Sequence, residues 1–115
     1  MKNNSVYLIH IIEAIEKIEK YISQLDEKSF YSSDLVQDAV IRELQIVGEA
    51  ARRIDQGVKD KSPQIAWSQL IGMRNILVHD YFTVDLDVVW VTLKDDLPLL
   101  KTEIQKLSQI SGLEF

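Results

Sequence analysis

The residues best suited to chemistry lie in one short stretch of the chain, between Arg74 and Tyr81. This motif holds a permanent cation, a carboxamide (Asn75), one of the two histidines of the chain (His79) and a phenol. A guanidinium can bind a phosphate through two hydrogen bonds, and an imidazole can transfer protons near neutral pH. Arg74 and His79 together therefore suggest chemistry on a phosphodiester or a nucleotide.

The spacing within the motif limits how it can work on one helix. Arg74 and His79 are five positions apart, so they lie about 140° apart around a regular helix, whereas Asn75 and His79 share a face. Three arrangements are open: the helix ends near His79, Arg74 reaches around it, or a second subunit completes the site. By spacing alone, capping is the simpler interpretation, because Arg and His near a helix end often bind its last carbonyls.

A few further polar residues are candidates for the same site. Glu49 is either a solvated charge on a helix or a carboxylate that orients the motif side chains. Arg42 and Arg52 are typical surface charges, although either could extend a phosphate-binding surface. His10 lies among isoleucines, which is typical of a packed or rim histidine. With two histidines and no cysteine, we find no spacing typical of a zinc site and expect neither a metal nor a cofactor.

The composition is that of an ordinary globular protein. The chain has 115 residues, of which 46% are hydrophobic and 27% charged, and we expect one domain over residues 1–115. The net charge of −5 argues against a broad nucleic-acid surface, but all four arginines lie in the middle third, which leaves room for a local basic site. The apolar run at residues 6–12 is too short to span a bilayer, so we expect a soluble cytoplasmic protein.

Apolar residues recur every three or four positions along most of the chain, which predicts helices that must position the motif. Helices are expected over residues 5–25, 34–56 and 67–78 and from about residue 85 onwards, with residues 26–33 as a polar connection. Expected caps are Asn4 or Ser5, Ser33 or Asp34, and Thr83 or Asp85. Because no segment shows sustained strand alternation, the chain is predicted to be an all-helical up-and-down bundle.

Five residues refine this prediction. Gly57 is expected to end the second helix, and Pro98 to break or kink the last one near residues 94–97. Gly48 is small enough to let another backbone approach closely. Trp67 and Trp90 are expected to anchor the core.

The motif Arg74-Asn75-Ile76-Leu77-Val78-His79-Asp80-Tyr81-Phe82 resembles the R-x4-H-x-Y signature of HEPN domains. It is most similar to the HepT-like branch, which is paired with minimal nucleotidyltransferases in bacterial and archaeal toxin–antitoxin modules. The motif departs from that pattern nowhere, and the resemblance covers nearly the whole chain. Further similar segments are residues 38–42, 46–51, 65–67, 71–75, 84–86, 89–90 and 96–98.

The resemblance implies an all-α HEPN-type bundle of four to five helices that forms a homodimer, with two Arg74/His79 sets meeting in a shared cleft. It implies metal-independent cleavage of RNA, with tRNA a plausible target, by the toxin of a type VII-like toxin–antitoxin system. His79 would be the general acid or base, Arg74 would bind the scissile phosphate, and Asn75 would support it. Tyr81 would accept adenylyl groups from the cognate nucleotidyltransferase antitoxin, which would block RNA by charge and bulk.

Two other functions are open at this point. The chain could be a non-catalytic dimeric nucleotide- or protein-binding module that positions a nucleotidyltransferase and is modified at Tyr81. It could also be a structural adaptor in which Arg74 and His79 only cap helices. RNA cleavage would distinguish the ribonuclease from both alternatives. Adenylylation of Tyr81 would distinguish the non-catalytic module from the structural adaptor.

Overall fold

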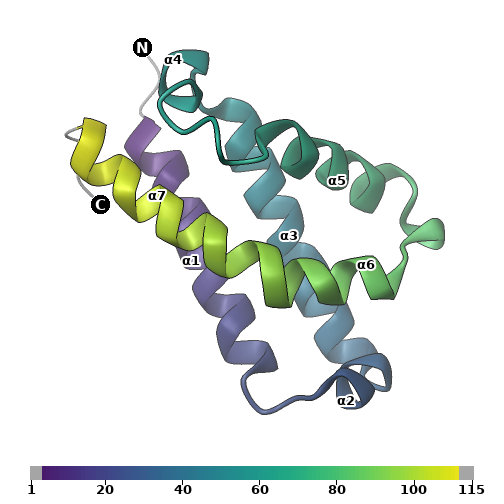
Figure 1. Cartoon of the computed structure of the whole chain (residues 1–115). Coiled ribbons are helices and arrows are strands. Elements are labelled where there is room, and N and C mark those ends of the chain that lie inside the picture. The colour runs from purple at the N-terminus through teal and green to yellow at the C-terminus, as the bar shows by residue number, and fades with distance from the viewer. Residues whose placement is uncertain (1–3, 112–115) are drawn as a thin grey trace.

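Helices account for the regular structure that the computed structural model describes, which covers residues 4–111 without the side chains of Tyr81 and residues 108–111. Within this range four long helical segments run up and down (Figure 1). They are α1 (Asn4–Ile22), α3 (Asp34–Arg53), α5 (Trp67–His79), and the continuous segment of α6 (Leu86–Val91), the π-helical turn η2 (Thr92–Asp96) and α7 (Leu97–Ser111). The short helices α2 (Glu27–Tyr31), α4 (Gln56–Lys59) and η1 (Tyr81–Thr83) lie in the connections. The predicted all-α bundle is confirmed.

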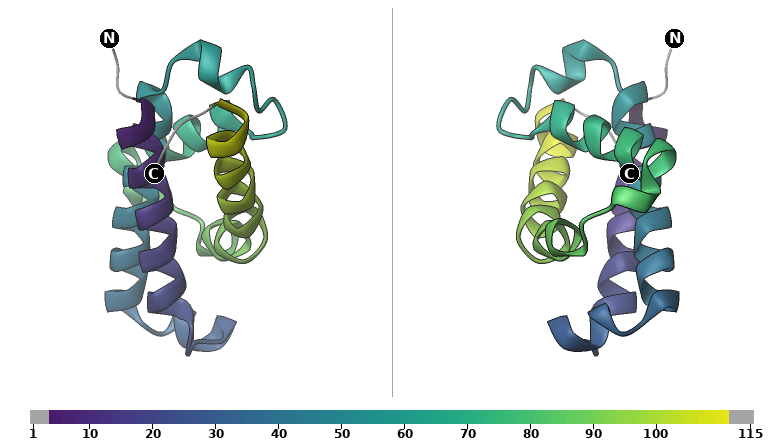
Figure 2. Two further views of the ribbon diagram at one scale, coloured as in Figure 1. Left: turned by 90° about the vertical axis from the view of Figure 1, so that its left-hand side faces the viewer. Right: turned by 90° about the vertical axis from the view of Figure 1, so that its right-hand side faces the viewer.

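Two layers enclose the hydrophobic core. Figures 1 and 2 show α1 and α3 side by side and antiparallel, with the α6–α7 segment lying across from them and α5 running antiparallel to that segment. Most of the side chains that are at most 1% exposed come from three of the long segments: Leu8, Ile11, Ile15 and Ile18 of α1, Val40, Val47 and Ala51 of α3, and Leu97, Ile104 and Leu107 of α7. Phe30 of α2 adds a ring that is fully buried. The periodic apolar residues are therefore the core residues, as the helical pattern predicts.

The ends of α3 show where local sequence signals succeed and fail. Ser33 caps its start, because its hydroxyl oxygen accepts a hydrogen bond from the Val36 N–H at 3.2 Å. The helix ends at Arg53, since Ile54 has an extended backbone that lets its side chain enter the core. The expectation that Gly57 ends this helix is wrong, because Gly57 lies inside α4.

Two other segments refine the expected connections. The predicted polar connection at residues 26–33 contains α2, which is capped by the Asp26 carboxylate accepting from the Ser29 N–H at 2.8 Å. Trp67 is 8% exposed and donates its indole N–H to the Ser62 carbonyl at 3.2 Å, so it anchors the start of α5 as expected. Trp90 is only half-buried and packs against Phe30 at the edge of the core.

The irregularity predicted near Pro98 takes the form of a π-helical turn inside a segment that stays helical. Pro98 has no N–H to donate, and its ring would collide with the carbonyl four residues earlier in a regular helix. The backbone widens instead over Thr92–Asp96, where the Leu97 N–H bonds to the Thr92 carbonyl. Asp85 caps the start of this long segment by accepting from the Asp87 N–H at 2.9 Å.

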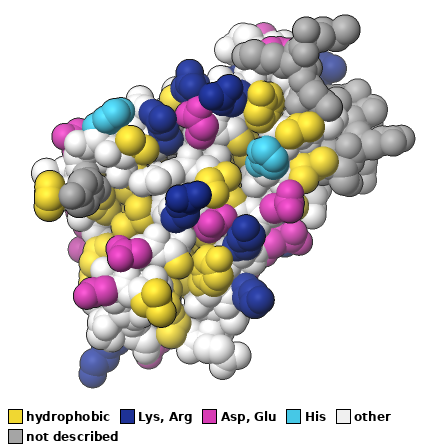
Figure 3. Space-filling view, turned by 180° about the vertical axis from the view of Figure 1, so that it is seen from behind, with side chains coloured by type: hydrophobic (Ala, Val, Ile, Leu, Met, Phe, Trp, Pro, Cys, Tyr) yellow, Lys and Arg dark blue, Asp and Glu magenta, His cyan; other side chains and the backbone are white. Residues whose placement is uncertain are grey.

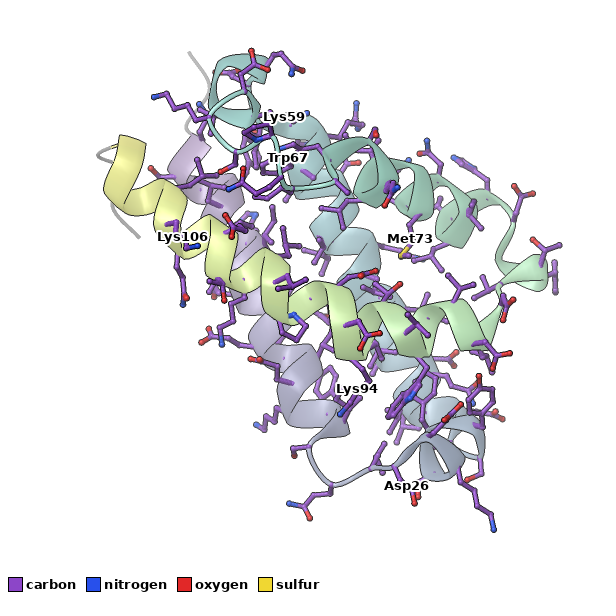
Figure 4. All side chains as sticks on the ribbon, viewed as in Figure 1. Asp26, Lys59, Trp67, Met73, Lys94 and Lys106 are labelled. Carbon is purple, nitrogen blue, oxygen red and sulfur yellow. The ribbon has the colours of Figure 1, made fainter. Side chains whose placement is uncertain are left out.

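The contact between α5 and the α6–α7 segment contains grooves. Met73 extends from α5 toward that segment (Figure 4) and lines two of them. One has a volume of about 450 Å³ and is bordered by the half-exposed apolar side chains of Ile76 and Val88. This side of α5 therefore presents accessible apolar surface, whereas its opposite side is held closely against α3.

Candidate active site

Gly48 sets how closely the motif helix α5 approaches α3. A Cβ atom at position 48 would lie 2.3 Å from the Cβ of Arg74 and 2.8 Å from the carbonyl oxygen of Leu70, both well inside contact distance. Only glycine fits this crossing without a shift of the backbone. The close approach predicted from the size of Gly48 is confirmed, and the residue it brings closest is Arg74.

A second contact from α3 satisfies the end of α5. The side-chain amide of Gln45 donates to the carbonyl oxygen of Leu77 at 3.3 Å. Leu77 lies in the last turn of α5, where carbonyls have no partner within the helix. Gln45 and Gly48 therefore hold the motif helix from the same side of α3.

Arg74 is held by two side chains. Its Nε lies 3.3 Å from Oε2 of Glu49, and its Nη1 donates to Oδ1 of Asn75 at 2.9 Å. Its side chain is 25% exposed, so the guanidinium is restrained but still accessible. The capping interpretation does not describe Arg74, because these contacts are to side chains and not to the carbonyls at the end of α5.

Glu49 is the centre of a cluster of three arginines. Its Oε1 lies 2.7 Å from Nη2 of Arg52 and 2.9 Å from Nε of Arg53, while Oε2 faces Arg74. Hydrogen bonding from Arg52, then from Arg53, and the positive charges of Arg52 and Arg74 outweigh the effect of burial and lower the pKa of Glu49 to about 2. One carboxylate thus faces three guanidiniums, and the cluster keeps an excess of positive charge on an acidic protein.

His79 is the last residue of α5, and its side chain is exposed. Asn75 lies one turn earlier on the same face and is exposed as well. The guanidinium of Arg74 bends toward that face through its hydrogen bond to Asn75. Of the three arrangements left open by the spacing, the first is present, because α5 ends at His79.

The remaining candidates lie at different distances from this centre. Arg52 belongs to the Glu49 cluster, whereas Arg42 is exposed about two turns earlier on α3. Arg42 borders a separate groove of about 690 Å³ between α3 and the end of α5, which Gln45 and Val78 also line. The backbone of Tyr81 begins η1, directly after the end of α5, but its side chain lies outside the described ones.

One face of the molecule carries most of these groups. Figure 3 shows both histidine side chains of the protein on this face, one on each side of a group of Lys and Arg side chains that surrounds an acidic one. Arg53 in the cluster and Gln45 beneath α5 were not singled out for the site from the sequence. Their spacing on α3 could have identified them. Residues 45, 52 and 53 lie three or four positions from Glu49 and so share its helix face.

The described residues hold neither a metal-binding cluster nor a membrane-spanning helix. No group of three His, Asp or Glu side chains among them lies close enough together to hold a metal ion. None of the described helices is both long and apolar enough to cross a membrane.

An all-α bundle that presents R-x4-H-x-Y at the exposed end of a helix is a HEPN-type domain. Residues 11–107 match the family model described as "Ribonuclease HepT-like". The chain belongs to this HepT-like ribonuclease family.

Curated relatives agree with the family. The chain is 41% identical over 106 residues to a "Probable ribonuclease HepT" of Thermococcus cleftensis, covering 92% of this chain and 96% of that protein. It is 42% identical over 108 residues, 94% of this chain, to a Methanocaldococcus jannaschii protein named "Gamma-glutamylcyclotransferase and putative RNase", of which it spans only 49%. No solved structure matches the chain.

Proposed function

We propose that this protein is a metal-independent endoribonuclease whose catalytic residues are Arg74 and His79. The observation that carries the proposal is the geometry of Arg74. Glu49 and Asn75 hold its guanidinium beside the exposed face on which His79 ends the helix. A pre-oriented cation next to an accessible imidazole is the minimum needed for acid–base cleavage of a phosphodiester.

The reaction uses the RNA as its own nucleophile. His79 removes the proton of a ribose 2′-hydroxyl, and the resulting oxygen attacks the adjacent phosphorus. The bond from phosphorus to the 5′ oxygen breaks, and that oxygen takes up a proton from an imidazolium. Arg74 binds the non-bridging oxygens and stabilises the charge that develops on them, while Glu49 and Asn75 keep it in place. The products are a 2′,3′-cyclic phosphate and a free 5′-hydroxyl.

A second copy of the chain would supply the second imidazole. The groove of about 450 Å³ beside the motif helix, with the half-exposed Ile76 and Val88 on its border, supports burial of this side in a homodimer. Two exposed His79 side chains would then face one cleft, one acting as base and the other as acid. Arg42 and Arg52 would extend the RNA-binding surface away from that cleft.

The proposed biological context is a toxin–antitoxin pair in the cytoplasm. The cognate nucleotidyltransferase would adenylylate Tyr81, which follows His79 by two positions. Each added AMP brings bulk and negative charge to the rim of the site, where it would repel the RNA backbone. Only protein that is not modified at Tyr81 would then cleave RNA.

The decisive experiment is RNA cleavage by the purified protein in the presence of a chelator. His79→Ala should reduce the rate about 100- to 10,000-fold, because it removes the proton-transfer group, and should abolish growth arrest on expression. Lys106→Ala, which removes an exposed cation from α7 on another part of the bundle, should leave the rate unchanged. Wild-type cleavage by the His79→Ala protein would refute the assignment.

The same preparations separate this function from a non-catalytic partner role. Incubation with the nucleotidyltransferase and ATP should add the mass of AMP to the wild-type protein but not to Tyr81→Phe. Addition of AMP without any RNA cleavage by the unmodified protein would favour the non-catalytic module.

A further inference from the structure

A pocket beside the arginine cluster has no role in the reaction described above. It lies between α1 and α3 and has a volume of about 260 Å³. Its lining consists of two rings, two apolar side chains and an ion pair: Tyr7, His10, Ile46, Ala50, Glu49 and Arg53. This volume is below the roughly 300–1,000 Å³ of pockets that enclose whole small molecules, so it suits a single ring.

The pocket shares the Glu49 side chain with the site around Arg74. Arg53 and Glu49 form part of its wall, and their ion pair measures 2.9 Å from Nε to Oε1. The other oxygen of the same carboxylate lies 3.3 Å from Nε of Arg74. A single carboxylate therefore separates the pocket from the guanidinium assigned to the scissile phosphate, and the two histidines flank this basic group on one face (Figure 3).

The two rings form a corner. The centroids of Tyr7 and His10 are 6.4 Å apart, with an angle of 80° between their planes. A flat ring that stacks on one of them presents its edge to the other, while Ile46 and Ala50 supply an apolar base. A nucleobase has this combination of an apolar face and a polar edge, and unpaired bases of RNA are commonly bound by stacking on aromatic side chains.

We propose that this pocket binds one unpaired base of single-stranded RNA, next to the nucleotide whose phosphate Arg74 holds. This inference rests on the proposed ribonuclease function and names its substrate class. The excess positive charge of the Glu49 cluster attracts the connecting backbone, although the whole chain has a net charge of −5. Double-stranded RNA does not fit, because its bases are stacked and inaccessible to a side pocket.

The test is equilibrium binding of a labelled single-stranded RNA to full-length protein carrying His79→Ala, so that the RNA stays intact. In that background His10→Ala and Tyr7→Leu should weaken binding by roughly 5- to 150-fold, the loss expected for one stacked base. Tyr7→Phe keeps the ring and should retain affinity. The control is Tyr21→Ala, which removes an exposed aromatic ring from the other end of α1 and should change nothing. The same RNA in a duplex should bind weakly, and its affinity should be the same for the wild-type pocket and for the pocket variants.

Each outcome decides between the subsite and the ribonuclease function. Cleavage by the wild type, with His10→Ala and Tyr7→Leu binding RNA as well as the control, would overturn the subsite and leave the ribonuclease intact. RNA binding that depends on the two rings, in a wild type that does not cleave, would keep the subsite and refute the catalytic proposal. Circular dichroism of every variant identifies any that fail to fold.

Discussion

At the scale of single residues, Glu49 does most to define the site. It fixes Arg74 from a neighbouring helix and at the same time pairs with Arg52 and Arg53. Its carboxylate therefore balances the positive charge of these arginines. An incoming phosphate must compete with the same carboxylate for Arg74. The lowered pKa of Glu49 reports how strongly the three arginines favour its charged form.

That lowered pKa predicts a particular dependence of stability on pH. Because the pKa of Glu49 is about 2 in the folded protein against 4.5 for an ordinary glutamate, its contribution is complete above about pH 4.5. It is lost as the pH falls toward 2. Glu49→Gln should remove about 1 kcal/mol of stability at pH 7, a value kept small by the exposure of Arg52 and Arg53. Urea unfolding at pH 7, 4.5 and 2.5 measures the difference.

The control for this prediction is Glu16→Gln, since Glu16 is exposed on α1 and reaches Lys101 only at 3.9 Å. Its stability should follow that of the wild type across the whole range. If the wild type and Glu49→Gln lose stability in parallel between pH 4.5 and 2.5, Glu49 does not have the assigned electrostatic role.

At the scale of elements, the crossing of α3 and α5 determines the site. Gly48 allows the close contact between the helices. Glu49, the next residue, pairs with Arg74, and Gln45 donates a hydrogen bond to the last turn of α5. The three residues occupy one side of α3, so a small shift of this crossing would disturb all of them together.

Gly48→Ala should test the crossing directly. The added methyl group collides with the Cβ of Arg74 and the carbonyl of Leu70, and overpacking of this kind costs about 1–3 kcal/mol. It should also lower RNA cleavage, because the Arg74 side chain moves away from Glu49. Thermal unfolding and initial cleavage rates measure the two effects.

Gly57→Ala is the matched control, because Gly57 is also helical, lies in α4 away from the motif, and has nothing within 4 Å of the added atom. It should be neutral or stabilising by up to about 1 kcal/mol, since alanine favours helix more than glycine. Equal stability and activity of the two alanine variants would show that the crossing is not as close as the structure has it.

At the scale of the whole molecule, the two sides of α5 are unequal. One is held closely against α3, and the other borders grooves and leaves Ile76 and Val88 about half exposed. A homodimer formed through this second side would bury that apolar surface and bring the ends of two motif helices together. The proposed two-histidine mechanism depends on this assembly.

Light scattering after gel filtration measures the assembly. The wild type should have twice the 13.3 kDa mass of one chain. Val88→Lys should be a monomer that keeps its helical circular dichroism but unfolds at a lower temperature, because the stabilisation from association is lost, and it should cleave RNA much more slowly, because it places a charge in the apolar contact. Leu35→Lys changes a residue that is 81% exposed at the start of α3 and should stay dimeric. A monomeric wild type that cleaves RNA, or a dimer broken only by Leu35→Lys, would contradict the proposed interface.

The sequence by itself determined the helices and the chemistry of the motif. Local signals are enough for this, because apolar periodicity, the cap residues Ser33 and Asp85 and the missing N–H of Pro98 act within a few positions of the chain. Gly57 shows the limit of such signals. A glycine allows a helix to end but does not require it, and α3 ends earlier because Ile54 is drawn into the core.

Only the tertiary structure decided which side chains meet. The sequence separates Arg74 from His79 by about 140° on one helix and leaves the role of Glu49 open. The pairing of Glu49 with Arg74, the turn of Arg74 toward Asn75, and the pocket of Tyr7 and His10 beside them all depend on how α1, α3 and α5 cross. Those crossings follow from the packing of the whole core, which couples residues far apart in the chain, and no local pattern contains that information.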